Sequence, residues 1–162
     1  MVKPLPEVLD FMQVLWRLVH GLEQVSKRMA ATTGITGPQR LVLRMVGLYP
    51  GISASRLAML LHVHPSTVTG VLRRLEAQGL LTREAHAEDR RRAVLTLSAQ
   101  GRRANRIRLG TAEAGVADAL QLLSTRDRIC TQHALATIAD RVEARGRLSR
   151  VLSAARRSVH PE

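Results

Sequence analysis

The residues from Ser53 to Gly101 constrain the fold of this chain most strongly, because they predict two short helices, a hairpin and a further helix in close succession. Ser53 can accept a hydrogen bond from a free backbone N–H at a helix start. Apolar residues then recur at helical spacing, as Leu57, Leu60 and Leu61. A short turn through His62 and Val63 separates this helix from the next. The pattern is typical of a helix-turn-helix.

The second of these helices combines an apolar stripe with a polar face. Pro65 fits its first position, where the missing N–H costs nothing. The stripe at i, i+3, i+4 and i+7 consists of Val68, Val71, Leu72 and Leu75. Hydroxyls, guanidinium groups and one glycine form the other face and its flanks, as Ser66, Thr67, Thr69, Gly70, Arg73 and Arg74. Such a face suits the DNA major groove, where hydroxyls bond phosphates or base edges and arginine bonds guanine. Gly79 is the expected left-handed cap.

Two β-prone runs after this helix predict a hairpin, or wing, with a cationic tip. The runs cover residues 80–85 and 93–97, and the tip holds Asp89, Arg90, Arg91 and Arg92. Three consecutive arginines repel one another unless anions lie nearby, and Asp89 can orient one of them through a bidentate pair. A narrow minor groove supplies an anionic field. Ser98 is the predicted start of a long helix that follows the second strand.

The charge of the chain favours an anionic partner. The formal net charge is +12, and eleven arginines but four acidic residues lie between positions 56 and 108. A strongly basic chain favours polyanions. An arginine-rich composition by itself would give only a solvated face, but the clustering beside the polar helix favours DNA contact.

Long helices are predicted on both sides of this region. Residues 5–31 carry a seam with alternating spacings of four and three, and residues 38–49 predict a second helix. Two amphipathic helices follow the wing, with a break near Ser124. One subunit cannot bury these stripes, so we expect a homodimer. In such a dimer the second helix of the helix-turn-helix, the recognition helix, occurs twice. Two recognition helices predict a pseudo-palindromic site with half-sites about one helical turn apart.

The predicted fold class is therefore mainly α with a small β wing, a winged helix-turn-helix core flanked by dimerisation helices. The expected organisation is an N-terminal dimerisation helix (1–34), the DNA-binding domain (35–100), C-terminal dimerisation helices (101–150) and a basic tail (151–162). No apolar run approaches the roughly 18 residues of a membrane span, and no secretory signal is evident. The expected location is the cytoplasm, at the nucleoid.

Other chemistry finds little support in the sequence. A glycine-rich phosphate loop, a nucleophile elbow and a metal-ligand spacing are missing, so we expect no enzyme, no cofactor and no metal site. The single cysteine, Cys130, excludes an intrachain disulfide. It follows the apolar Ile129, which favours a buried, inert thiol over a redox sensor. Trp16 and His20 lie one helical turn apart, and packing at the dimer seam is favoured over contact with an effector.

Several spaced motifs resemble the MarR family of bacterial transcription regulators: Leu57–Ala58, Pro65–Thr69, Leu75–Leu80, Arg83, Asp89–Arg91 and Leu97–Gly101. The resemblance implies a triangular dimer in which terminal helices interlock and each subunit carries one winged helix. It also implies that Arg91 reaches the minor groove while Asp89 orients it. Members of the family commonly bind small aromatic or phenolic effectors between the DNA-binding lobe and the dimer helices.

Two positions depart from the family pattern. The residue before the recognition helix is often Ser in the family and is His64 here, which leaves the capping bond open. The position after Ser55 is frequently acidic, whereas Arg56 adds a phosphate contact. The predicted DNA contacts are Ser53, Arg56, Pro65, Ser66, Thr67, Thr69, Arg73, Arg74, Asp89, Arg90, Arg91 and Arg92.

These features predict a sequence-specific regulator of double-stranded DNA, with repression favoured and release by a small effector. An architectural protein that coats DNA through charge is the alternative, and it would show steep salt dependence with little sequence preference. A protein-docking module would instead require an exposed apolar patch on the recognition face.

Overall fold

The computed structural model describes residues 5–85 and 93–159, with side chains up to residue 146. The chain forms two compact units, residues 1–115 and 116–162. The elements in chain order are α1 (Glu7–Thr33), α2 (Gly37–Leu48), α3 (Ala54–Leu60), α4 (Pro65–Ala77), β1 (Leu81–Ala85), β2 (Ala93–Leu97), α5 (Ala99–Arg106), α6 (Ala112–Gln121) and α7 (Thr125–Val159). This mainly helical fold with a small β wing confirms the predicted fold class.

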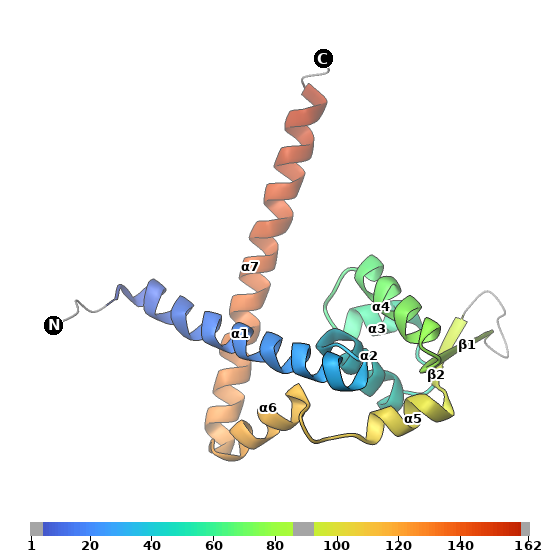
Figure 1. The fold of residues 1–162 in the computed structure, drawn as a ribbon. Coiled ribbons are helices and arrows are strands. Elements are labelled where there is room, and N and C mark those ends of the chain that lie inside the picture. Colours follow the sequence, from blue (N-terminus) through green and yellow to red (C-terminus); the bar gives the residue numbers. More distant parts are fainter. Residues whose placement is uncertain (1–4, 86–92, 160–162) are drawn as a thin grey trace. The chain divides into compact units, whose positions relative to one another are not determined.

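The first unit is built around a helix-turn-helix core (Figure 1). α2, α3 and α4 pack together, and the antiparallel hairpin β1–β2 covers one end of the core, with Leu81 opposite Leu97. The backbone of Ile52 pairs with that of Leu95, which adds a single-residue antiparallel bridge beside the hairpin. Leucine and valine fill the interior, and the most completely buried side chains are Leu43, Val46, Leu57, Val68, Leu72, Leu75 and Leu95.

The helix boundaries follow the predicted capping residues. The Ser53 hydroxyl accepts a hydrogen bond from the Arg56 backbone N–H at 3.2 Å, and the Ser98 hydroxyl accepts one from Gly101 at 2.9 Å. Gly79 follows α4 with φ of 66°, a left-handed conformation that glycine adopts without steric cost. A further capping box at the start of α2, between Thr36 and Gln39, had not been predicted.

The long helix expected to start at Ser98 is interrupted, which corrects the prediction. α5 ends at Arg106, and a loop leads to α6 through Gly110, whose φ is 73°. Thr111 then caps α6, because its hydroxyl accepts a hydrogen bond from the Ala114 N–H at 3.3 Å. The apolar periodicity continues across this loop, so it did not reveal the break.

The second unit consists of the rest of α6 and of α7. The predicted break near Ser124 is confirmed, since its hydroxyl accepts a hydrogen bond from Asp127 N–H at 3.1 Å and caps α7. The backbone of α7 continues to Val159, so most of the segment expected to be a basic tail extends this helix. None of the described helices combines the length and apolar character needed to cross a membrane.

Cys130 is exposed, so the expectation of a buried thiol is wrong for this chain. It lies in the first turns of α7, and Ile129 beside it is exposed as well. An apolar neighbour in sequence predicts which helix face could be buried, but burial itself requires another element to cover that face.

Candidate nucleic-acid interface

The recognition helix α4 is oriented by its apolar stripe. Val68, Leu72 and Leu75 are buried in the core, and Val71 is half-buried against it. The opposite side of the helix therefore faces solvent. All of the predicted contact residues on α4 are exposed, namely Pro65, Ser66, Thr67, Thr69, Arg73 and Arg74, together with Gly70. The structure thus brings these side chains together on one accessible surface.

His64 caps α4, which settles the bond that the sequence left open. Its Nδ1 accepts a hydrogen bond from the Ser66 backbone N–H at 3.3 Å and lies 2.7 Å from Ser66 Oγ. An imidazole nitrogen without a proton can accept at a helix start as a serine oxygen does. Sequence reasoning missed this role because histidine is not among the common N-cap residues.

The hydroxyl groups near the start of α4 are held in place by local hydrogen bonds. Thr69 Oγ1 donates to the Pro65 carbonyl at 3.0 Å, and Ser66 Oγ is held by His64. A hydroxyl that donates one hydrogen bond keeps acceptor capacity for a further partner. These groups are therefore oriented but still able to bond a ligand.

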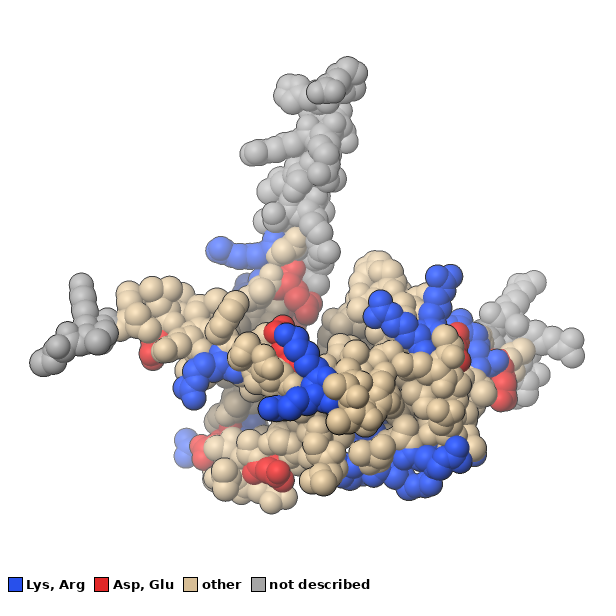
Figure 2. All heavy atoms as spheres, viewed as in Figure 1, with Lys and Arg blue, Asp and Glu red and all other residues tan. Residues whose placement is uncertain are grey.

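The described arginines near this surface differ in their salt bridges. Arg83 Nε, on β1, lies 2.9 Å from Glu76 Oε1 at the end of α4. Arg73 and Arg74 form no salt bridge with any carboxylate in the described part of the chain. Figure 2 shows blue side chains over α4 and the start of the wing. The positive charge of Arg73 and Arg74 is available to an anionic ligand.

The remaining predicted contacts lie partly within and partly outside the described residues. Ser53 is half-buried and its hydroxyl caps α3, while Arg56 is exposed in the first turn of that helix. The described hairpin ends at the pair Ala85–Ala93. The predicted wing-tip contacts Asp89, Arg90, Arg91 and Arg92 lie outside the described residues.

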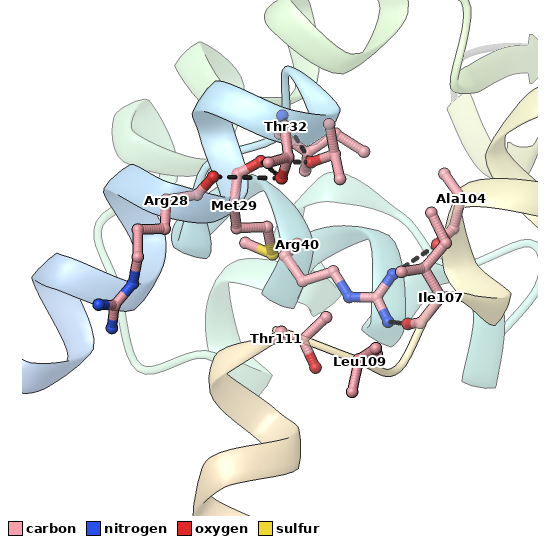
Figure 3. Close-up of a pocket in the computed structure, with 11 residues that line it drawn as sticks. Arg28, Met29, Thr32, Arg40, Ala104, Ile107, Leu109 and Thr111 are labelled. Atoms are coloured by element: carbon pink, nitrogen blue, oxygen red, sulfur yellow. Dashed lines mark hydrogen bonds between the residues drawn. The ribbon is translucent and has the colours of Figure 1, made fainter.

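A hollow of about 210 Å³ lies in the same unit, away from α4 (Figure 3). The end of α1, α2, the end of α5 and the following loop form its walls, with Arg28, Met29, Thr32, Arg40, Ile107 and Thr111 among the lining residues. Trp16 and His20 do not line it. Trp16 is 73% exposed, and His20 Nε2 lies 3.4 Å from Gln24 Nε2 on the same helix. The structure therefore does not bring the predicted effector residues to this hollow.

Arg40 is a buried cation on the wall of this hollow that sequence reasoning missed. Its side chain is 4% exposed, and its Nε lies 2.6 Å from Glu113 Oε1. Its Nη1 donates to the Ala104 carbonyl at 2.6 Å, and its Nη2 donates to the Ile107 carbonyl. Figure 3 shows the guanidinium reaching these carbonyls. Arg40 therefore joins α2 to the end of α5 and to the first turn of α6. No sequence signal separates it from a surface arginine.

The environment of this ion pair shifts two ionisation equilibria. Burial acts to raise the pKa of Glu113, but hydrogen bonds from its own backbone N–H and from Arg40 outweigh burial, and the pKa is lowered overall. Burial, followed by repulsion from Arg108 and Arg40, lowers the pKa of Arg44. Charges gathered between α2 and the loop after α5 contribute to both shifts.

A buried helix-turn-helix core, an exposed polar recognition helix and a two-stranded wing define the class of winged helix-turn-helix domains. Residues 35–93 match the model of the MarR family. This match confirms the resemblance of this region to the MarR family.

Comparison with known proteins agrees with this assignment. An aligned stretch of 69 residues is 39% identical to an HTH-type transcriptional repressor of Mycobacterium tuberculosis. This stretch covers 43% of this chain and 50% of the relative. The chain thus spans about half the length of the curated relatives it matches.

Solved structures of low identity share the fold. MepR of S. aureus, solved as a DNA complex, has a TM-score of 0.68 and 19% identity, with coverage of 82% of this chain and 97% of that one. PcaV of Streptomyces coelicolor, solved with its natural ligand, has a TM-score of 0.67 and 24% identity, with coverage of 86% and 98%.

Proposed function

We propose that this chain is a sequence-specific, double-stranded DNA-binding transcription regulator of the MarR type. In this proposal it represses transcription by binding a pseudo-palindromic operator as a homodimer. The observation that carries the proposal is the exposed face of α4, where oriented hydroxyls lie beside Arg73 and Arg74, which form no salt bridge with a described carboxylate. Such a face matches the donor and acceptor pattern of a major groove.

The wing completes the proposed interface. Arg91 is assigned to the minor groove, with Asp89 orienting its guanidinium, on the basis of the sequence motif. Arg56 and Ser53 at the start of α3 are assigned to the phosphate backbone, because helix N-termini and exposed arginines commonly position DNA-binding domains in this way.

The dimer is proposed from apolar side chains that a single chain leaves uncovered. On α1, Phe11, Trp16 and Leu18 are exposed, and on α7, Ile129 and Val142 are exposed. Surfaces of this kind favour burial against another protein, and a second copy of the chain can cover the exposed side chains of both α1 and α7. The predicted packing of Trp16 and His20 at a dimer seam is part of this proposed interface. Analytical ultracentrifugation should find a dimer, and a folded monomer at micromolar concentration would contradict the proposal.

The hollow beside Arg40 is the proposed effector site. Met29, Ile35 and Ile107 supply apolar walls, while Thr32 and Thr111 supply hydroxyls. This combination suits a small aromatic or phenolic compound. Arg40 links the hollow to α2, which packs directly against α4, so occupancy can alter the position of the recognition helix. Titrating such compounds into the protein–DNA complex should release DNA.

Selection of bound duplexes from a random DNA pool at physiological salt tests the proposal. A regulator should enrich one palindromic sequence, because base contacts from α4 distinguish among duplexes. Binding without enrichment, with a steep dependence on salt, would instead identify an architectural DNA-binding protein.

A further inference from the structure

A second basic surface lies on α5 and on the loop that follows it. It consists of Arg102, Arg103, Arg106 and Arg108, and we call it the α5 arginine patch. All four side chains are exposed. No acidic residue occurs in the sequence between Ser98 and Ala112. Figure 2 shows the blue side chains gathered along the lower edge of this unit, over α5.

The patch is not neutralised within the described part of the chain. None of its four arginines forms a salt bridge there, and the next carboxylate along the sequence, Glu113, binds Arg40 at 2.6 Å. Burial and then repulsion from Arg108 and Arg40 lower the pKa of the neighbouring Arg44. The field around α5 is therefore positive and unbalanced. A helix C-terminus favours a cation in its last turn, but Arg102 and Arg108 lie outside that turn.

The patch also has a defined shape. The Arg102 Nη1 donates to the Leu97 carbonyl at 2.8 Å, which fixes this side chain against the end of β2. Arg102 and Arg106 lie one helical turn apart and line the same groove with Asn105. The groove has a volume of about 480 Å³, and α2, β2 and α5 form its walls.

The position of the patch separates it from the proposed operator site. α4 and α5 both pack against α2, and Figure 1 shows them on opposite sides of that helix. Double-stranded DNA is stiff, with a persistence length of about 150 base pairs. A duplex seated on α4 therefore passes the unit on the side away from α5.

We propose that the α5 arginine patch binds the phosphate backbone of a second double-stranded DNA segment while α4 holds the operator. This inference rests on the proposed function. Guanidinium groups pair readily with phosphate oxygens, and such contacts carry no sequence requirement. The expected result is a protein that bridges two duplexes, one chosen by sequence and one by charge.

Duplex DNA is favoured over a single strand by the composition of the groove. Proteins that hold single strands stack bases on aromatic side chains. Among the residues that the structure describes, no aromatic side chain lines the groove beside Arg102 and Arg106. The side chains of Arg102, Asn105 and Arg106 instead offer hydrogen-bond donors that suit the phosphate backbone of a duplex.

A bridging assay tests the inference. The selected operator duplex is immobilised, loaded with the full-length protein, and incubated with a labelled duplex of unrelated sequence at about 150 mM salt. The variant Arg106→Gln/Arg108→Gln removes two charges from the patch and no hydrogen bond described above. It should retain operator affinity within about twofold and capture about tenfold less labelled duplex, because two phosphate contacts are lost. The control Arg126→Gln/Arg141→Gln removes the same charge from α7 and should bridge as the parent does.

Each other outcome has a distinct meaning. Equal capture by the parent and the patch variant would overturn the inference, as would equal losses in the patch variant and the control. Preferential capture of a labelled RNA of equal length would overturn the assignment to duplex DNA. Parallel loss of operator binding in the patch variant would place α5 in the operator contact instead. Failure of the parent to bind any operator would contradict the proposed function itself. Arg103→Gln serves as a second variant if circular dichroism shows that the double variant is unfolded.

Discussion

Arg73 is the residue on which base recognition should depend most. Its position on the exposed side of α4 is fixed by the buried Leu72 beside it in sequence, and no described carboxylate neutralises it. An arginine so placed can bond both acceptors of a guanine edge.

Arg73→Ala should therefore weaken binding to the selected operator by about 1 to 3 kcal/mol and relax the preference at one base position. Fluorescence anisotropy with the operator and with single-base variants measures both effects. Arg126→Ala, which removes a charge from α7, provides the control. An equal loss across all sequences would identify Arg73 as a phosphate contact.

Gly70 lies in the interior of α4, where glycine is less favourable than alanine. It is exposed, and a Cβ built at this position would meet no other atom within 4 Å. Glycine in a helix interior costs about 1 kcal/mol relative to alanine. Packing against the described residues therefore offers no reason for this glycine, whereas close approach of a duplex does.

Gly70→Ala should raise the free energy of unfolding by about 0.5 to 1 kcal/mol, because alanine restricts the unfolded chain and favours the helix. It should also weaken operator binding, because the added methyl group holds the helix away from the bases. Chemical denaturation and anisotropy measure the two quantities. Gly115→Ala on α6, where an added Cβ also meets nothing, should leave operator affinity unchanged. A stabilised variant with full affinity would remove Gly70 from the interface.

At the scale of elements, α5 lies in close contact with the backbone of Leu80, which precedes β1. Gly101 lies in the first turn of α5, and a Cβ there would overlap the Leu80 carbonyl oxygen. The same carbonyl accepts a hydrogen bond from the Ser98 N–H at 3.1 Å. Since the obstacle is backbone rather than a flexible side chain, α5 would have to move away from the segment that leads into β1.

Gly101→Ala should therefore destabilise the protein by several kcal/mol, comparable to overpacking a core. Thermal unfolding followed by circular dichroism measures the change. The substitution Gly115→Ala introduces the same group where space is open and should not destabilise. A melting temperature equal to that of the parent would contradict the close contact.

At the scale of the whole molecule, the Arg40–Glu113 pair bears on the stability of the first unit, because it joins α2 to the first turn of α6. The pKa of Glu113 is lowered from its ordinary value of 4.5 in the folded protein. A lowered pKa means that the charged carboxylate stabilises the fold. The contribution is complete above about pH 4.5, and it declines as the pH falls below this value through the folded-state pKa.

Glu113→Gln should be less stable than the parent at neutral pH, because Arg40 remains buried without a counter-charge. The difference should shrink as the pH falls below about 4.5, because the parent carboxylate then becomes protonated. Urea denaturation of both proteins between pH 7 and pH 3 measures the two curves. A difference that stays constant across this range would contradict a stabilising role for the charged carboxylate.

The sequence could predict those parts of the molecule that depend on local chemistry. Ser53, Ser98 and Gly79 mark helix ends through their own backbone preferences, and the spacing of Val68, Leu72 and Leu75 determines which side of α4 faces out. For the same reason, the predicted residues of the α4 face lie together in the structure. Burial of an amphipathic stripe leaves one orientation for the opposite side.

Only the tertiary structure decided the features that depend on distant partners. Arg40 is buried because Glu113 and the carbonyls of α5 meet it, although Glu113 lies far along the chain. The exposure of Cys130 and the end of α5 at Arg106 likewise depend on what covers a face or interrupts a helix. A local pattern specifies which groups need a partner, whereas the packing of elements that are distant in sequence determines which partner each group finds.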